Sequence, residues 1–345
     1  MSMTIKGYLA LFVLASILML PSTAFALRPT IADANADTSG QISLDPLPSW
    51  NEGTAKTAII SFVANVTNTS SPNYVEPEER IATFDNDGTL WCEYPDYVQS
   101  LFMLDRIREM SSKHPEWNDT EPFRSILSGE RFATSNFSTI EAMQIYVAIS
   151  ANLTPDEYIS LARDWLSRSN NSELGIPHTS CVYKPMLELM SYLREKDFKT
   201  YIVTGGDEDF VRSFSEEAYA IPPEQVIGSA FKLQYVENNS SCSLVKLPDI
   251  LVINDGQEKP KEIQQNIGLQ PILAYGNSDG DIPMLKFATS ENRYSLGLLN
   301  CHDDPVREFA YDNSTAVGRL DKGLTLAGQL GWQVVSMKDD WMEII

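Results

Sequence analysis

Residues 82–91 read ATFDNDGTLW, and this stretch decides the fold that we expect for the chain. With Ile81 before it, the stretch begins as a short apolar segment, which is typical of a buried strand. Asp85 and Asp87 follow where the apolar segment ends, and a Gly-Thr turn comes directly after them. Ligands of open α/β sheets collect at the carboxyl ends of strands, so two acids at this point predict a functional site.

Two later apolar segments also end in small and polar residues. KTYIVTGG ends in the Thr-Gly-Gly of residues 204–206, and PILAYG runs into the polar stretch 277–281. Lys259 lies between them in the sequence, with Lys261 as a second candidate. Because parallel strands end at the same edge of a sheet, we expect these groups to meet although they are far apart in the chain.

These residue types suit phosphoryl transfer. One carboxylate can attack phosphorus and form an acyl phosphate, and a second can protonate the leaving oxygen and later activate water. A hydroxyl and backbone N–H groups can hold phosphate oxygens, while a lysine neutralises charge that develops in the transition state. A hard divalent cation such as Mg²⁺, held by oxygen ligands, would let an anionic phosphate approach an anionic aspartate.

The order of these motifs resembles the haloacid dehalogenase superfamily. DNDGTL, the strand ending in TGG, the lysine and GNSDGDIPML match its four motifs in sequence, and the resemblance spans about residues 45–345. It is closest to the exported acid phosphatase-like and phosphoserine phosphatase-like hydrolases of that superfamily. One such motif is moderately specific, whereas four in order are strongly so.

The resemblance implies a role for each matching residue. Asp85 would be the nucleophile, Asp87 the general acid and base, and Lys259 the cation that bridges Asp85 and the phosphate. The phosphoryl group would be bound by Thr204, Gly205 and Gly206.

A magnesium site is also implied. Its ligands would be Asp85, Asp87 through its backbone carbonyl, Asn277 and Asp281, with Asp279 as a further candidate. Many members of the family have Asp where this chain has Asn277, and an amide supplies a neutral oxygen in place of a charged one. The reaction is less affected by this difference than the ligand set is.

Trp91 and Glu93 follow the first motif closely and are candidates for substrate binding. Trp91 would present an aromatic face, and Glu93 would pair with an amine of the substrate; packing between core and cap is the alternative for both. His302, Asp303 and Asp304 resemble a metal cluster, but we expect Asp303 or Asp304 to be a helix N-cap before Pro305. His114 and His178 read as surface or loop residues.

The predicted fold class is α/β: a three-layer α/β/α Rossmann-like core with a parallel sheet and a helical cap inserted after the first motif. Helical periodicity without a strand pattern fills most of residues 95–179, which we predict to be the cap. Residues 45–94 and 180–345 would form the core. In the second part, residues 207–220 read as one helix, and 225–229 and 231–237 as two short strands, the latter paired with 241–248.

Residues 1–26 read as a secretory signal peptide, and 27–44 as a disordered leader. The first segment has Lys6, an apolar run of 13 residues and the small-residue site AFA. An uncleaved anchor is the alternative. We therefore expect an exported protein that is periplasmic, on the cell surface or secreted.

The charge of the chain restricts its partners. Without the first 26 residues it carries 25 basic and 47 acidic residues, a net charge of −22. Such a chain repels nucleic acid and anionic lipid, so we expect a small phosphorylated substrate and no nucleic-acid or further membrane partner. The four cysteines lack C-x-x-C spacing, which disfavours a zinc site; export permits disulfides in three pairings, and a nucleophilic Cys92 is a minor alternative.

The sequence therefore predicts an exported, Mg²⁺-dependent phosphomonoester hydrolase that acts through an aspartyl phosphate. A phosphotransferase or a dehalogenase of the same fold is one alternative, although a dehalogenase needs no second acid such as Asp87, because halide leaves without a proton. A catalytically inactive, extracytoplasmic metal- or phosphate-binding protein is the other, and Asn277 is its only support. The sequence indicates neither the substrate nor the oligomeric state.

Overall fold

The computed structural model describes residues 45–131, 137–238, 240–290, 293–315 and 317–345. The predicted signal peptide and leader lie outside these residues. Within the described part, no helix is both long and apolar enough to cross a membrane.

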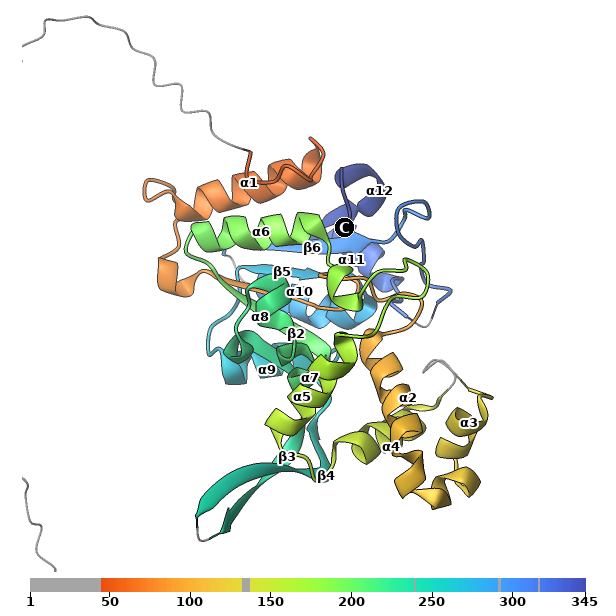
Figure 1. The fold of residues 1–345 in the computed structure, drawn as a ribbon. Coiled ribbons are helices and arrows are strands. Elements are labelled where there is room, and N and C mark those ends of the chain that lie inside the picture. Colours follow the sequence, from red (N-terminus) through yellow and green to blue (C-terminus); the bar gives the residue numbers. More distant parts are fainter. Residues whose placement is uncertain (1–44, 132–136, 239, 291–292, 316) are drawn as a thin grey trace, which may run out of the picture. The chain divides into compact units, whose positions relative to one another are not determined.

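A single sheet organises residues 45–345. The described strands follow the order β4-β3-β2-β1-β5-β6-β7, and every neighbouring pair is parallel except β3 and β4. Figure 1 shows this sheet between helices on its two faces. The strands are β1 (Ile81–Phe84), β2 (Lys199–Asp207), β3 (Val226–Asn238), β4 (Ser241–Val252), β5 (Leu273–Gly276), β6 (Leu296–Cys301) and β7 (Gln333–Ser336).

The helices divide between the two faces of the sheet and the segment between β1 and β2. They are α1 (Thr54–Thr67), α2 (Val98–Met110), α3 (Phe123–Ser128), α4 (Thr139–Ser150), α5 (Pro155–Leu166), α6 (Lys184–Glu195), α7 (Glu208–Arg212), α8 (Ser215–Tyr219), α9 (Glu258–Asn266), α10 (Ile282–Thr289), α11 (Lys322–Leu330) and α12 (Met337–Asp340).

Alternation along the strands creates two hydrophobic layers. Successive side chains of a strand point to opposite faces, and Leu273 and Tyr275 of β5 belong to one core whereas Ala274 belongs to the other. The first core also takes in α1 and α6, and the second takes in α9, α10 and α11. The predicted three-layer α/β/α arrangement is therefore confirmed.

The helices α2 to α5 form the insertion between β1 and β2, as predicted, and Figure 1 shows α2, α3 and α4 grouped away from the sheet. Two of them begin with strong local signals. Ser138 and Thr154 cap α4 and α5, and each hydroxyl and the glutamate three residues later exchange hydrogen bonds. Helices therefore occupy much of the segment for which the sequence predicted helical structure.

Two details differ from the prediction. Residues 226–238 form one continuous strand, β3, where two short strands were expected; its pairing with the segment of β4 was expected, and because that pairing is antiparallel the sheet is mostly rather than wholly parallel. The helix expected over 207–220 is broken into α7 and α8 at Phe214, whose ring stacks on Trp91 at 4.4 Å between centroids. The sequence left open whether the four cysteines form disulfides, and all four are free.

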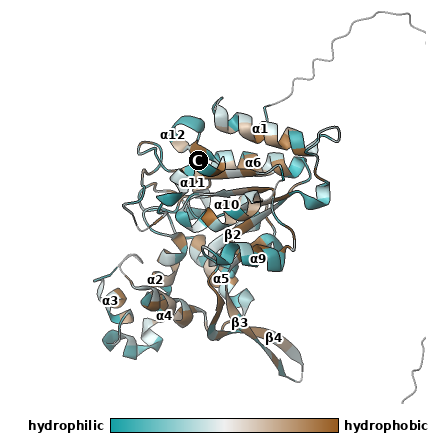
Figure 2. Cartoon of the chain, turned by 180° about the vertical axis from the view of Figure 1, so that it is seen from behind, coloured by the Kyte–Doolittle hydropathy of each residue, from teal (hydrophilic) through white to brown (hydrophobic). Residues whose placement is uncertain are grey.

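The hairpin projects from the sheet and carries apolar side chains that water reaches. Figure 2 shows brown segments along β3 and β4, and Tyr235 and Leu251 are 60% and 62% exposed. Near its base the hairpin pairs with the insertion: Lys246 N donates to Leu153 O at 2.8 Å, and Asn152 N donates to Lys246 O at 2.8 Å. The loop between α4 and α5 is thus bonded to the edge strand β4.

Candidate active site

The end of β1 continues as an ordered loop beside β5. Asp85 N donates to Tyr275 O at 2.9 Å, which extends the ladder between these two strands by one residue. The chain then turns sharply: Asn86 O accepts from the N–H groups of Thr89 and Leu90, and Gly88 has a φ of +71°. A residue with a Cβ is strained at such a φ, so the glycine of DNDGT is required by the turn.

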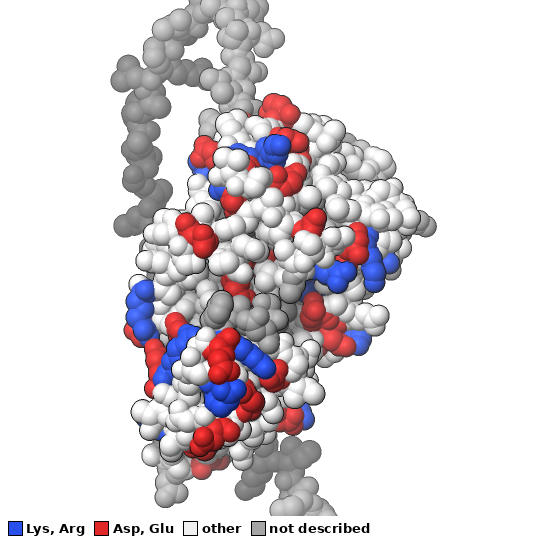
Figure 3. Space-filling model, turned by 90° about the vertical axis from the view of Figure 1, so that its right-hand side faces the viewer, with Lys and Arg blue, Asp and Glu red and all other residues white. Residues whose placement is uncertain are grey.

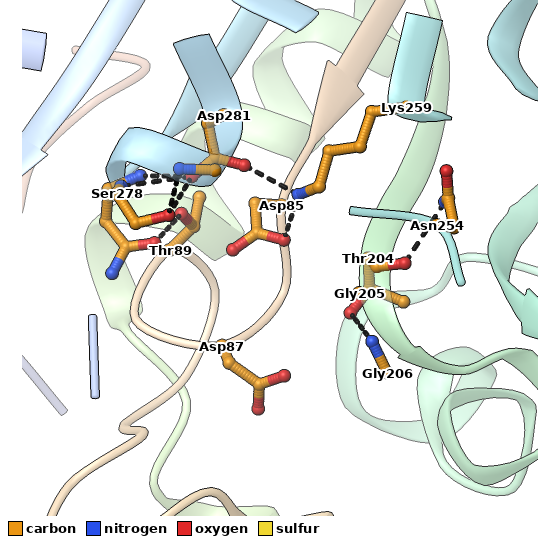
Figure 4. Close-up of polar contacts among 12 residues, drawn as sticks. Asp85, Asp87, Thr89, Thr204, Gly205, Gly206, Asn254, Lys259, Ser278 and Asp281 are labelled. Atoms are coloured by element: carbon orange, nitrogen blue, oxygen red, sulfur yellow. Dashed lines mark hydrogen bonds and ion pairs between the residues drawn. The ribbon is translucent and has the colours of Figure 1, made fainter. Parts of the chain in front are cut away.

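Asp85 and Asp281 meet at one lysine. The Lys259 ammonium lies 2.7 Å from Asp85 Oδ1 and 2.6 Å from Asp281 Oδ1, and Figure 4 shows it between the two carboxylates. Lys259 is 2% exposed, whereas Lys261 points into solvent and pairs with Glu258. Of the two lysines that the sequence offered, only Lys259 lies at the end of β1.

Burial shapes the electrostatics of this group. It raises the pKa of the Asp85 carboxyl; the Asp281 carboxylate adds to the rise and the Lys259 ammonium opposes it. Burial opposes the protonated form of Lys259, but the two carboxylates outweigh it and raise the lysine pKa. The lysine therefore stays cationic and keeps a positive charge beside the Asp85 oxygen.

Asp87, the second acid of the DNDGT stretch, lies apart from Lys259. Asp87 Oδ1 accepts a 2.8 Å bond from the Trp91 indole N–H, and burial raises the pKa of Asp87 although that bond opposes the rise. A Cβ added to Gly206 would lie 4.0 Å from Asp87 Oδ2, so this carboxylate faces the end of β2. Its raised pKa suits a group that must donate a proton.

The end of β2 forms a small loop opposite Asp87, as Figure 4 shows. Thr204 is fully buried and its Oγ1 accepts from Gly206 N at 3.0 Å, while Gly205 is exposed. Asn254 donates to Thr204 O at 3.1 Å and holds the loop from the hairpin side. A small, open turn with backbone N–H groups is what a phosphate needs for close approach.

Oxygen atoms from β1 and β5 make up the expected metal site. In the described residues no group of three or more His, Cys, Asp and Glu side chains is arranged to hold a metal, so the site would need the Asp87 carbonyl and the Asn277 amide as well. Asn277 is 1% exposed. The donor atoms are all oxygen, which suits a hard cation such as Mg²⁺. The buried carboxyl groups of Asp85, Asp87 and Asp281 also outnumber the ammonium of Lys259 beside them, so a further positive charge would be favourable there.

Asp281 has other partners in the structure. Its Oδ2 accepts from the N–H groups of Asn277 and Ser278 at 3.1 and 3.0 Å, and its Oδ1 meets Lys259. Its role as a metal ligand stays a prediction. Asp279 accepts from the backbone of residues 321–323 at the start of α11, which is the use expected of an acid at a helix N-terminus.

The two predicted substrate contacts are buried. Trp91 is fully enclosed between Asp87 and Phe214, and Glu93 is 2% exposed and accepts from Asn277 Nδ2 and the Tyr311 hydroxyl.

Burial raises the pKa of the Cys92 thiol far above its usual range, which disfavours a thiolate nucleophile.

Several residues that form hydrogen bonds within the candidate site were not singled out from the sequence. Thr89 and Ser278 lie inside the quoted motifs, so their positions could have identified them. Gln99 and Asn254 carry no sequence signal, because they reach the loop of Thr204 from α2 and from beyond β4.

Comparison with known proteins bears on this arrangement. The sequence profile described as "haloacid dehalogenase-like hydrolase" matches residues 82–286. No curated protein matches the chain.

Solved structures with a similar fold share little sequence with the chain. A conserved protein of unknown function from Anaerococcus prevotii is 17% identical, with a TM-score of 0.47, covering 72% of this chain and 86% of its own. A protein of unknown function from Bordetella pertussis is 14% identical, with a TM-score of 0.45 and coverages of 74% and 98%. A phosphoserine phosphohydrolase-like protein from Francisella tularensis is 15% identical, with a TM-score of 0.36 and coverages of 65% and 88%.

Proposed function

The chain belongs to the haloacid dehalogenase-like hydrolase family, and from this premise we propose that it is a Mg²⁺-dependent phosphomonoester hydrolase that acts through an aspartyl phosphate. The observation that carries the proposal is the contact of Asp85 with a buried ammonium at the sheet edge where the loop of Thr204 also lies. Lys259 lies 2.7 Å from Asp85 Oδ1, and Asp87 faces the same loop. The substrate is a small phosphate ester.

In the first half-reaction, Asp85 Oδ attacks phosphorus and the bond from phosphorus to the ester oxygen breaks. The leaving alcohol takes its proton from Asp87, whose raised pKa keeps that proton available. Lys259 neutralises charge on the equatorial phosphate oxygens, and the loop of Thr204 and Gly205 binds them.

In the second half-reaction, Asp87, now ionised, accepts a proton from water. The resulting hydroxide attacks phosphorus, the acyl phosphate bond to Asp85 breaks, and inorganic phosphate leaves. Asp85 returns as a carboxylate and Asp87 as an acid, so protons and charges balance over one turnover.

Mg²⁺, when bound, would reduce the repulsion between the phosphate and Asp85. The residues that would hold it are Asp85, the backbone carbonyl of Asp87 and the side-chain oxygen of Asn277, with Asp281 next to them. The chain as a whole has a net charge of −21, so an anionic substrate needs such a local cation to approach.

Hydrolysis of p-nitrophenyl phosphate by residues 27–345 tests the proposal. We expect activity that needs Mg²⁺, is abolished by a chelator and is lost in Asp85→Asn. Equal activity in that variant would point to another nucleophile. A protein that binds Mg²⁺ but turns over no ester in a broad screen would favour the binding-protein alternative.

Trapping the intermediate separates hydrolysis from other reactions of the fold. Asp87→Asn slows the water step, so acid-quenched protein should carry one phosphoryl group by intact-mass spectrometry, and Asp85→Asn should carry none. Adding an alcohol acceptor distinguishes a phosphotransferase, because the phosphorylated acceptor would then form in place of inorganic phosphate.

We also propose that the protein is exported, on the strength of the signal-like residues 1–26. N-terminal sequencing of the protein recovered from its native cells tests this. A mature N-terminus near residue 27 is expected, and a retained Met1 in the cytoplasmic fraction would contradict it.

A further inference from the structure

Asn277 presents two chemically different ends to its surroundings. Its Nδ2 donates to Glu93 Oε1 at 2.8 Å, and its Oδ1 accepts from Thr89 Oγ1 at 3.2 Å. Only the oxygen of an amide can bind a cation. The acceptor at Glu93 therefore decides which end of Asn277 is available to a metal.

The position of Glu93 is built into the fold. Its Oε1 also accepts from the Tyr311 hydroxyl at 2.6 Å. Two glycines with positive φ make room for the carboxylate: a Cβ on Gly88 would lie 2.4 Å from Oε1, and one on Gly318 would lie 2.0 Å from it. Side chains at either position would displace the acid, so the close contact with Asn277 depends on both glycines.

We propose that Glu93 is a positioning residue of the metal site, which orients the amide of Asn277 and, in its ionised form, supplies the negative charge that an aspartate would have carried there. The inference rests on the proposed function, since it concerns the cation of that reaction. An amide whose N–H donates to a carboxylate is polarised, and its oxygen becomes a stronger ligand. Glu93 therefore acts behind Asn277 and does not pair with an amine of the substrate.

Burial favours this role over substrate binding. Glu93 is 2% exposed, and its Oε1 already accepts hydrogen bonds from Asn277 Nδ2 and the Tyr311 hydroxyl. A substrate amine would have to displace Asn277 or Tyr311 to reach that oxygen. A residue that acts through Asn277 needs no such access.

Reversing the polarity of the pair tests the proposal. Mg²⁺ binding is measured by calorimetry without substrate on the wild type, Glu93→Gln, Asn277→Asp and the double variant. We expect Glu93→Gln to weaken Mg²⁺ binding about 10-fold, the scale usual for a carboxylate behind a metal ligand. Asn277→Asp alone places two carboxylates in contact and lowers the melting temperature.

The double variant, which combines Glu93→Gln with Asn277→Asp, is the decisive protein. The introduced glutamine amide can donate to the introduced carboxylate, so the hydrogen bond persists in the opposite direction and the charge moves to the ligand position. We expect Mg²⁺ affinity within about threefold of the wild type. Glu308→Gln is the matched control, because Glu308 is a buried glutamate that bonds to His302 and Tyr183 instead, and it should leave Mg²⁺ affinity unchanged.

Two results would overturn the inference. One is unchanged Mg²⁺ affinity in Glu93→Gln together with a raised KM for amine-bearing phosphate esters, which would make Glu93 a substrate contact. The other is a folded double variant that does not recover Mg²⁺ binding. Absence of Mg²⁺ binding in the wild type would instead contradict the proposed function itself, and the inference with it.

Discussion

Two lysines of this protein are buried between two aspartates each, and they differ in what surrounds them. Lys259 lies 2.7 and 2.6 Å from Asp85 and Asp281. Lys246 lies 3.3 Å from Asp207 and 2.9 Å from its second partner, Asp209. Both lysines are 2% exposed, so neither burial nor pairing distinguishes a reactive cluster from a structural one.

The two lysine clusters differ in the residues that surround them and in whether solvent reaches those residues. The Lys246 ammonium lies 4.0 Å from the ring centroid of Tyr158 and 5.3 Å from that of Phe231, and the Tyr146 hydroxyl donates to Asp207. These aromatic rings close the cluster. Lys259 instead lies where β1 and β5 end, on the same sheet edge as the loop of Gly205, whose exposed backbone leaves that edge open to solvent. A buried ion pair becomes a candidate catalytic group only where the backbone leaves such an opening.

The two clusters also join different parts of the chain. Lys259 links two strand ends of the core through α9. Lys246 links the hairpin to α7 and, through Tyr158 and Tyr146, to the helices of the insertion. We therefore expect variants of the first to lose activity and variants of the second to lose stability.

The largest expected effect is on turnover. Lys259→Met should lower kcat about a thousandfold, because the charge that forms on the phosphate loses its cation. Lys261→Met is the matched control, since that lysine lies two residues away and is exposed, and it should keep full activity. The comparison of the two clusters fails if both variants behave alike.

Lys246→Met should instead unfold the protein more easily. It leaves Asp207 and Asp209 buried without their cation, which costs about 3–5 kcal/mol in the free energy of unfolding. Urea denaturation measures this. Combining it with Asp207→Asn and Asp209→Asn removes the unpaired charges, and stability should largely return; no recovery would show that the lysine is needed for something other than charge balance.

Acid should loosen the insertion through His178. This histidine was expected to be a surface or loop residue; it lies in the connection between α5 and α6 but is 3% exposed. It stacks on Trp165 of α5, and burial lowers its pKa to about 4. Between pH 6.5 and 4 the unfolded chain binds the proton more tightly, so stability falls as pH falls, by about 2 kcal/mol. His178→Gln should flatten this part of the pH profile of the melting temperature, and an unchanged slope would exclude the histidine as its source.

The smallest effect concerns the residue that joins the two regions. Gln99 of α2 accepts from Asp207 N at 2.8 Å, directly after the loop of Thr204. Gln99→Ala should lower kcat/KM about fivefold, since one neutral hydrogen bond is worth about 1 kcal/mol. A raised KM with an unchanged kcat would indicate that this bond positions the loop of Thr204 for substrate binding alone.

Local patterns could predict much of this molecule. The strand ends at Phe84 and Gly276, the capped helices α4 and α5, and the meeting of Asp85 with Lys259 follow from signals within a few residues of each group. Lys246 could not be predicted, because its segment SCSLVKLP resembles any half-exposed strand and its partners lie on other elements. The break at Phe214 likewise depends on its stacking with Trp91, a contact between distant residues.

The sequence also predicted the excess of acidic over basic residues, but it could not predict how these residues are arranged on the surface. Figure 3 views the side on which α3 lies and shows basic and acidic side chains next to each other in its lower half. Ion pairs lie within or near α3, such as those of Arg124 with Glu121 and Glu130. The excess of acid over the whole chain therefore does not produce a uniformly negative insertion.

The backbone bonds between Lys246 and the loop of Asn152 and Leu153 limit how the active site can open. The insertion is joined to the rest of the chain at further places, among them the bond from Cys92 N to Cys181 O at 3.0 Å and the bond from Asp207 N to Gln99 Oε1 at 2.8 Å. A body fastened at several points cannot swing freely. Wide opening must therefore break the two bonds at Lys246 or move the hairpin together with the insertion.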